Sequence, residues 1–295
     1  MEKINKEGRE MIKTYVEIKR WDNQEVIHSG YFNSVKECLE DGVKRGISFY
    51  RADLKNANLE YANLENANLA NANLYKSRLA KANLSYANLE NVYLENANLS
   101  YATLYNSRLA KANLIYANLE NVYLENANLR CANLSYANLE NANLENAFLY
   151  NSRLTNTNLS YTNLKNACFY DSRLENANLE NANLKYANLS YANLENACFY
   201  DSRLENANLE NANLRSCKGN NKEVKNISIF EEYKVVYTKD ILQIGCEGHL
   251  IEDWKGFSDE RIFIMDGQRG LDFWHKNKYY IFNKIKEDPA FLFFV

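Results

Sequence analysis

Residues 52–71 read ADLKN-ANLEY-ANLEN-ANLAN, and units of this five-residue form continue in frame to Leu214, 33 units in all. The third residue of the unit is Leu in 31 of them and Phe in the other two. The first residue is Ala in most units and otherwise a compact side chain: Ser77, Val92, Ser107, Val122, Ser152, Thr157, Thr162, Ser172 or Ser202. This restriction at two sites indicates that both side chains point into a confined interior.

A period of five residues fits neither regular element, because it advances a helical side chain by roughly 140° per unit and alternates faces on a strand. Within one unit, the small residue and the Leu are two apart. A short extended piece therefore points both inward and turns the middle residue, usually Asn, to solvent. If the last two residues bend by about a right angle, four units close a coil of roughly twenty residues, and identical side chains stack.

This arrangement predicts about eight coils with leucines along the axis. The following residues represent the predicted structural core: Leu54, Leu74, Leu94, Leu114, Leu134, Leu154, Phe169, Leu174, Leu194, Phe199 and Leu214. The corner sites hold mostly Asn, which tolerates positive φ, but eight hold Tyr, which tolerates it less well. We therefore expect the corners to mix turn types.

Ala52-Asp53-Leu54, Ala57-Asn58-Leu59 and their successors resemble the A(D/N)LXX motif of the pentapeptide repeat proteins. The resemblance covers residues 52 to 214 and implies a mainly β fold, a right-handed quadrilateral parallel β-helix. The inward alternation and the corners follow from the residues themselves, whereas handedness and square section are implied by the family. Family members include proteins thought to imitate DNA on type II topoisomerases such as gyrase, some of which protect against quinolones.

Composition divides the chain into three parts, because all Gly, Trp and His and the single Pro lie outside the repeats. A solenoid that simply stopped would expose a Leu layer and strand edges, so caps are expected at both ends. We assign an N-terminal ββα cap to residues 1–49, the repeat β-helix to 50–215 and a C-terminal α+β cap to 216–295.

Strands are predicted in the N-terminal cap at 12–21 and 26–32, around a turn at 22–24. A helix follows, with Ser34 and Glu37 as capping box and Gly46 as stop. Ile47 and Phe49 then fall on inward sites of the repeat frame.

The C-terminal cap is predicted to hold strands at 233–237 and 241–245 and helical pieces near 251–254 and 258–265. A loop at 267–270 and a helix over 271–287 follow. The apolar tail, 290–295, is expected to pack on its own cap or on a second subunit, which would make a homodimer through this region.

The N-terminus is charged and no apolar run approaches the roughly 18 residues of a spanning helix, which predicts a cytoplasmic protein. Segments such as Gln243 to Cys246 resemble flanking domains of bacterial and phage-type pentapeptide repeat proteins, and this resemblance implies a bacterial protein. Six irregularly spaced cysteines favour reduced thiols over a disulfide framework. Cys168 and Cys198 lie 30 residues apart, one and a half coils, and should project from opposite faces.

No catalytic constellation emerges from the sequence, so we expect neither an enzyme nor a cofactor or metal. Cys246 and His249 could form half of a zinc site, but further ligands are missing nearby. The favoured interpretation is a buried thiol beside a hydrogen-bonded imidazole. Gly267 to Gly270 is too short for a phosphate loop and is interpreted as a turn.

Five units contain Tyr-x-Ser-Arg-Leu, and projecting Arg and Tyr favour protein interfaces. Their spacing scatters them over four faces, and only Arg153 and Arg173 share one, which makes these two residues the candidate interaction patch. The alternative, which we favour, is tandem duplication of a 30-residue segment without selection for a patch.

Net charge separates two functional hypotheses. A rod of eight coils is roughly 40 Å long, and duplex DNA of that length carries about 24 negative charges. Residues 51–215 hold 16 acidic and 14 basic side chains, a net charge of −2. The tract contains acidic pairs that are not expected to fall on one face. These pairs are Glu60/Glu65, Glu90/Glu95, Glu120/Glu125 and Glu140/Glu145.

The favoured function is therefore a non-enzymatic scaffold that presents the rod or its caps to a protein partner of unknown identity. A DNA-mimicking modulator of gyrase is the alternative, disfavoured by the near-neutral charge. Nucleic acid, a membrane and a small-molecule substrate are not expected as partners, since no basic field or spanning segment is present.

Overall fold

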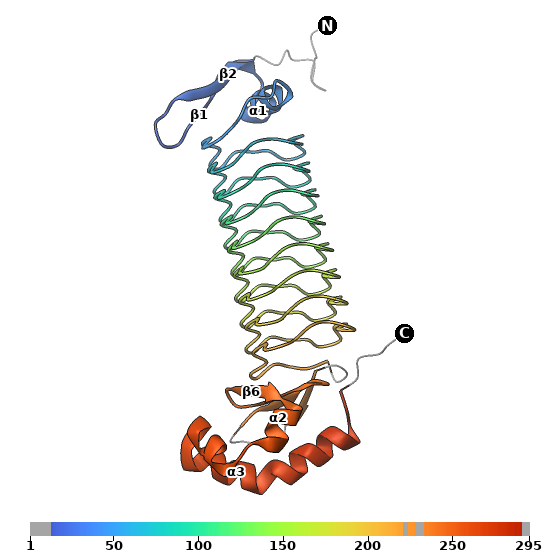
Figure 1. Ribbon diagram of the computed structural model, residues 1–295. Coiled ribbons are helices and arrows are strands. Elements are labelled where there is room, and N and C mark those ends of the chain that lie inside the picture. Colours follow the sequence, from blue (N-terminus) through green and yellow to red (C-terminus); the bar gives the residue numbers. More distant parts are fainter. Residues whose placement is uncertain (1–12, 221–223, 228–232, 291–295) are drawn as a thin grey trace.

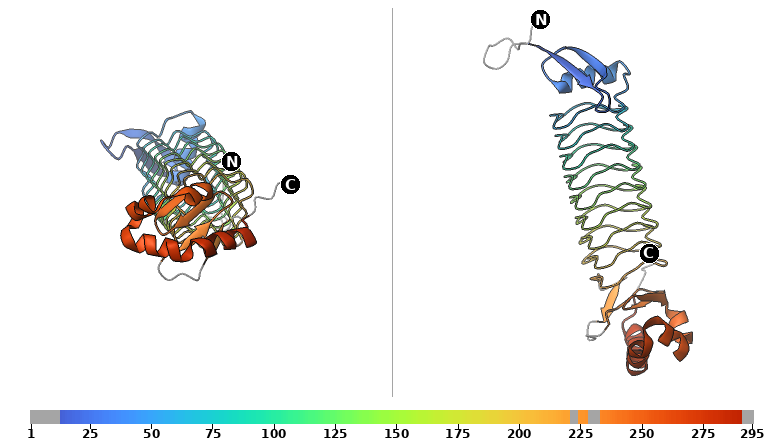
Figure 2. Two further views of the ribbon diagram at one scale, coloured as in Figure 1. Left: turned by 60° about the horizontal axis from the view of Figure 1, so that its bottom comes forward. Right: turned by 90° about the vertical axis from the view of Figure 1, so that its left-hand side faces the viewer.

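The computed structural model describes residues 13–220, 224–227 and 233–290 (Figure 1). A rod of stacked coils forms the middle of the molecule, and small folded elements close both of its ends (Figures 1 and 2). Within these described ranges, none of the helices is long and apolar enough to cross a membrane.

Each middle residue of a unit pairs in parallel with the residue twenty positions further on, from Asp53 with Asn73 to Cys198 with Lys218. Twenty residues are four units, so the chain forms a β-solenoid with four corners per coil. Leu54 N–H donates to Asn73 O, and Asn73 N–H donates to Ala52 O, both at 2.8 Å. Each face contributes one bridged residue per coil. The backbone is therefore paired on every face, but it contains no long strands within the repeats.

The interior is a continuous stack of third-site side chains. All of them are at most 9% exposed, and the predicted core residues from Leu54 to Leu214 are at most 2% exposed. Where a first-site residue is Ser or Thr, its buried hydroxyl donates to a backbone carbonyl in several units, as from Ser107 Oγ to Leu104 O at 2.7 Å. Hydroxyls therefore fit the small site when a carbonyl lies within reach.

The corners are uniform, so the prediction of mixed turn types was wrong. All 34 corner residues from Arg51 to Ser216 have φ between 52° and 61°, including every Tyr, and each turn is closed by a bond such as Ala57 N–H to Leu54 O at 3.0 Å. The left-handed conformation costs a non-glycine residue about 1–2 kcal/mol. It persists because the corner amide also bonds the next coil, as Asn56 N–H does to Tyr75 O, which fixes the backbone.

The N-terminal cap consists of β1 (Thr14–Lys19) and β2 (Val26–Phe32), paired antiparallel, followed by α1 (Val35–Lys44). The predicted N-cap is confirmed, since Ser34 Oγ accepts from Glu37 N–H. The carboxylate of Glu37, however, bonds Asn33 N–H instead of completing a reciprocal box with Ser34. Gly46 has a φ of 72° directly after the helix. The predicted strand residue Ile12 lies outside the described residues.

This cap supplies bonds that a preceding coil would otherwise make. Asp53 N–H donates to Lys19 O and Asn63 N–H donates to a Glu40 carboxylate oxygen of α1, both at 2.7 Å. Phe49 N–H donates to Asn68 O, and the Phe49 ring is fully buried. Phe49 therefore occupies an inward site of the repeat frame, as predicted, with Ile47 packed against the same core.

The C-terminal elements are a four-stranded antiparallel sheet and two helices. The strands follow one another in the order β3 (Lys225–Ile227), β4 (Val235–Tyr237), β5 (Ile241–Ile244) and β6 (Glu247–Leu250). The helices are α2 (Ile251–Gly256) and α3 (Asp259–Glu287). The sequence predicted β4 and β5 but neither β3 nor β6, which are short and whose side chains do not form a clear apolar alternation.

The loop predicted at 267–270 was also wrong in extent. Only Asp266 and Gly267 leave helical geometry, so α3 consists of two helical segments joined at these two residues, where Gly267 adopts a φ of 59°. A second core lies between this helix and the sheet, where the Trp254 and Trp274 rings lie 5.1 Å apart. Ala290 is buried there, whereas residues 291–295 of the predicted apolar tail lie outside the described residues.

Three side-chain amides close the last coil. Gln243 of β5, 2% exposed, accepts from Leu214 N–H at 2.5 Å, where a further coil would present a carbonyl. Its Nε2 donates to Asn213 Oδ1 at 2.8 Å, which extends a ladder of stacked Asn side chains. Asn220 donates to Ser202 O and Asn226 donates to Cys217 O. The open edge of the solenoid is thus capped by amides that mimic backbone.

Candidate functional site

The structure places Arg153 and Arg173 directly above one another, as bridge partners in adjacent coils. Arg173 Nε lies 3.0 Å from Glu175 Oε1, and Thr155 donates to the other oxygen of Glu175. Partial burial alone would raise the pKa of the Glu175 carboxyl, but a backbone hydrogen bond and the Arg173 and Thr155 contacts outweigh it and lower the pKa. Within the described residues, Arg153 has no acidic partner.

The other three arginines of the same motif are neutralised by nearby glutamates on the rod. Arg78 pairs with Glu60 and Arg108 with Glu90, both at 2.6 Å. Arg203 lies 3.6 Å from Glu205. Arg173 also has a glutamate neighbour, so among the five arginines of the motif Arg153 alone has no acidic partner within the described residues, and the pair is distinguished by its position on one face in adjacent coils.

Cys246 and His249 are not arranged as the sequence suggested. Cys246 is exposed, so the prediction of a buried thiol was wrong. Cys246 precedes β6, whose short polar strand was not predicted. His249 Nε2 lies 3.1 Å from Glu247 Oε2, and its ring packs edge-on against Trp254 and Phe257. His249 thus has a packing role and a carboxylate neighbour on its own strand.

Among the described residues, no group of three or more His, Cys, Asp and Glu side chains could hold a metal ion. All six cysteines are free thiols. Burial raises the pKa of the Cys38 thiol to about 11, with a smaller contribution from the Asp41 charge. Burial likewise raises the pKa of Cys217. Neither thiol is therefore a nucleophile at neutral pH.

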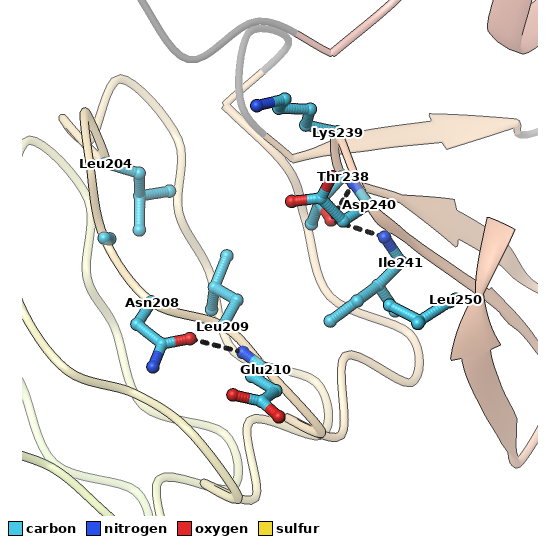
Figure 3. A pocket seen from close by; sticks show the side chains of 10 residues that line it. Leu204, Asn208, Leu209, Glu210, Thr238, Lys239, Asp240, Ile241 and Leu250 are labelled. Carbon is cyan, nitrogen blue, oxygen red and sulfur yellow. Dashed lines mark hydrogen bonds between the residues drawn. The ribbon is translucent and has the colours of Figure 1, made fainter. Parts of the chain in front are cut away.

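A cavity of about 290 Å³ lies between the last coil and the C-terminal sheet (Figure 3). Apolar side chains from both sides line it, notably Leu209 of the solenoid and Ile241 of β5. Charged groups at its border are Glu210, Lys239 and Asp240. Its polar lining is Asn208, Glu210, Thr238, Lys239 and Asp240, and Thr238 Oγ1 accepts from Ile241 N–H at 3.0 Å as part of the β4–β5 turn.

The acidic pairs are distributed less evenly than the sequence predicted. Glu60, Glu120 and Glu140 are separated by multiples of twenty residues and therefore share one face of a coil that repeats every twenty residues. Their partners, which lie five positions further on, share the next face for the same reason. Only the Glu90/Glu95 pair lies on the other two faces. The four pairs together therefore do not fall on one face, as predicted, although three of them share the same two neighbouring faces.

Sequence reasoning also missed a pocket between the β1–β2 turn and the first coils, lined by Trp21, Tyr75, Tyr93 and three polar residues. Trp21 and Tyr93 are 72 positions apart, so no local motif connects them. The available indication was that the middle site of one unit near the start of the tract holds an aromatic residue, Tyr93, in place of the usual Asn.

Among solved structures, the chain is similar in sequence to two pentapeptide repeat proteins from cyanobacteria. The chain is 32% identical to HetL from the cyanobacterium Nostoc sp. strain PCC 7120, involved in heterocyst differentiation regulation, over 56% of this chain and 82% of that one, with a TM-score of 0.37. It is 43% identical to Rfr23 from Cyanothece 51142 over 32% of this chain and 61% of that one, with a TM-score of 0.29.

QnrB1, a plasmid-mediated fluoroquinolone resistance protein, is 17% identical over 48% of this chain and 78% of that one, with a TM-score of 0.24. A search among curated proteins finds no match to the chain.

The family profile described as pentapeptide repeats matches in 8 copies, over residues 47–85, 77–114, 107–146, 137–176, 169–201 and 197–221. These matches span more than half of the chain, and they coincide with the solenoid whose register and core are described above. The chain therefore belongs to the pentapeptide repeat family.

Proposed function

We propose that the protein is a non-enzymatic scaffold that presents a rigid rod, or one of its caps, to a protein partner. The observation that carries this proposal is the unbroken ladder of hydrogen bonds from the N-terminal cap to the C-terminal sheet. Such a rod holds its surface side chains at fixed spacings, which lowers the entropy lost on binding. The family assignment supports a structural or interaction role, since repeat solenoids present extended binding surfaces.

The proposal also includes the handedness and length of the solenoid, its caps, and the setting in which the protein acts. The solenoid is right-handed, square in section and about eight coils long, with caps over residues 1–49 and 216–295. The protein acts in the bacterial cytoplasm without a cofactor, a membrane or nucleic acid as partner. A homodimer through the C-terminal region is compatible with this function.

The contact point that we propose on the rod is the stacked pair Arg153 and Arg173. Arg side chains are enriched at binding hot spots, and Arg153 projects without an acidic partner among the described residues. A partner that supplies a carboxylate would make charge-assisted hydrogen bonds to the pair. Removal of both guanidiniums should then weaken binding more than removal of two arginines that already have ion-pair partners.

A second candidate function is modulation of DNA gyrase by imitation of DNA. The alignment of Glu60, Glu120 and Glu140 on one face supports it, because it places carboxylates in a row along the rod. A net charge of −2 over the tract opposes it, because duplex DNA of equal length carries about 24 negative charges.

Affinity capture from the native cytoplasm tests the scaffold proposal. A specific partner should be recovered by the parent protein and by the control double variant Arg78→Ala/Arg108→Ala, but not by Arg153→Ala/Arg173→Ala. Equal recovery by both double variants would contradict the proposed contact point. A gyrase supercoiling and quinolone-protection assay tests the alternative: dose-dependent action at micromolar protein would reverse the ranking.

A further inference from the structure

The pocket under the N-terminal hairpin combines aromatic walls with polar groups. It has a volume of about 360 Å³ and is lined by Trp21, Lys55, Asn73, Tyr75, Tyr93 and Glu95. The last five residues belong to one face of the first three coils, since Asn73 and Tyr93 are bridge partners and the others lie two residues further along. Trp21, from the turn that joins β1 and β2, closes the pocket from the side of the cap.

The Trp21 ring is held in place before any ligand arrives. Its backbone N–H donates to Arg51 O at 2.9 Å, and its indole Nε1–H donates to Asn71 O at 2.8 Å. The ring meets Tyr93 edge to face, with centroids 6.1 Å apart. Trp21 is 37% exposed and Tyr93 is 42% exposed. A fixed aromatic surface that remains open to solvent is a preorganised platform for a flat apolar group.

The polar groups of the pocket carry both signs of charge. The ammonium groups of Lys55 and Lys76 lie 5.4 and 5.2 Å from the centre of the Tyr75 ring. Glu95 Oε1 accepts from Asn113 Nδ2 at 2.5 Å. Glu95 Oε2 is buried and has no hydrogen-bond partner among the described residues. The Glu95 carboxylate therefore retains accepting capacity that the protein does not use.

We propose that this pocket binds the pyranose ring of a neutral glycan. The pocket carries one basic and one acidic side chain, Lys55 and Glu95, so it has no excess charge that would select a cationic or an anionic ligand. A purely apolar ligand would leave the Glu95 carboxylate desolvated and without a donor. A neutral sugar ring offers an apolar C–H face to the Trp21 and Tyr93 rings. It also offers hydroxyls that accept from Lys55 and that donate to Glu95, whose carboxylate would exchange its hydrogen bond from Asn113 for one from the ligand.

The chain provides its own matched control. The sequence Asn-Val-Tyr-Leu-Glu-Asn occurs at 91–96 and again at 121–126. Glu125 accepts from Asn143 at 2.6 Å and has the same buried, unpartnered Oε2 as Glu95. No indole lies over Tyr123 among the described residues, because Trp21 is the sole Trp at this end. The proposed binding therefore depends on Glu95 and should be indifferent to Glu125.

Intrinsic fluorescence of the full chain reports on the pocket. Trp254 and Trp274 are only 3% and 2% exposed, so ligand-dependent changes arise mainly from Trp21. Titration with neutral oligosaccharides, namely cellohexaose, maltohexaose, xylohexaose and chitohexaose, should give a saturable shift for at least one. Glu95→Ala should weaken that binding about tenfold, the loss of one hydrogen bond to a charged acceptor, whereas Glu125→Ala should leave it unchanged. Calorimetry with Trp21→Phe, a variant that removes the indole but keeps a ring, should show weaker binding.

Thermal melts of each variant check that the solenoid is intact. The proposal is overturned if none of the four sugars gives a saturable response up to about 10 mM, a concentration tenfold above a Kd of about 1 mM. It is also overturned if the Glu95 and Glu125 variants bind alike. A neutral proline-rich peptide that shifts Trp21 fluorescence when no sugar does would identify a peptide groove and likewise refute glycan binding.

Discussion

Replacement of Gln243 by Met tests whether the side-chain amide completes the solenoid. Met keeps the length of the side chain but neither accepts from Leu214 N–H nor donates to Asn213 Oδ1, bonds of 2.5 and 2.8 Å in the structure. The Leu214 amide is enclosed, so leaving it unpaired costs about 1–3 kcal/mol, whereas half-exposed Asn213 can turn to water at a cost of about 1 kcal/mol.

The expected destabilisation is therefore about 2–4 kcal/mol, equivalent to a fall of roughly 3–6 °C in Tm for a chain of this size. Urea unfolding followed by circular dichroism measures it, and hydrogen exchange at the Leu214 amide locates it. Gln268→Met is the control, because Gln268 is exposed on α3 and bonds only Asp272. If Gln243→Met and Gln268→Met had equal effects, or if the Leu214 amide stayed protected, the amide cap would be refuted.

Three further predictions concern the core, the corners and the thiols. Leu134→Asp, which buries a charge at a site that is fully buried, should abolish cooperative melting, whereas Glu140→Ala should shift the midpoint little; similar melts would contradict the inward assignment. Tyr186→Gly should stabilise the rod by about 0.5–1 kcal/mol in urea titrations, since Tyr186 has a φ of 59° and is 55% exposed; a loss of stability would show that corner strain is absent. Burial raises the pKa of the Cys38 thiol from 9.0 to about 11. The protonated thiol therefore stabilises the folded protein fully below pH 9, and this contribution is lost as the pH rises towards 11. Urea midpoints measured against pH should therefore fall over this range, and less steeply in Cys38→Ala.

The repeat frame carries most of the information about the fold. The two restricted sites in each unit suffice to predict the inward Leu stack and the four-cornered coil. The reason is that the space near the axis limits side-chain size in the same way in every unit, so the same residue types recur. The corner geometry was not predictable from residue preference. Tyr186 alone would avoid positive φ, but the coils above and below it impose that conformation through backbone bonds.

The ends were harder to predict because their roles depend on distant contacts. Gln243 resembles any strand residue until Leu214, 29 positions earlier, is placed against it. The carboxylate of Glu40 and the Trp21 indole act on the first coils in the same way. The arginine pair was predictable as a pair, since the coil period alone stacks Arg153 on Arg173, but the acidic partners of the other arginines on the rod could be identified only from side-chain positions.

Because each coil consists of four units, the number of units also determines the orientation of one cap relative to the other, in steps of a quarter turn. Insertion of one pentapeptide would lengthen the rod by a quarter of a coil and rotate everything beyond it by about 90° around the axis. A duplicated block of 30 residues, such as those beginning at Tyr75 and Tyr105, adds one and a half coils and turns the far end by half a revolution. Each such duplication turns the distal cap to the opposite side of the rod. Lengthening of the repeat tract therefore changes the direction of that cap in discrete steps, while the packing of the core stays the same.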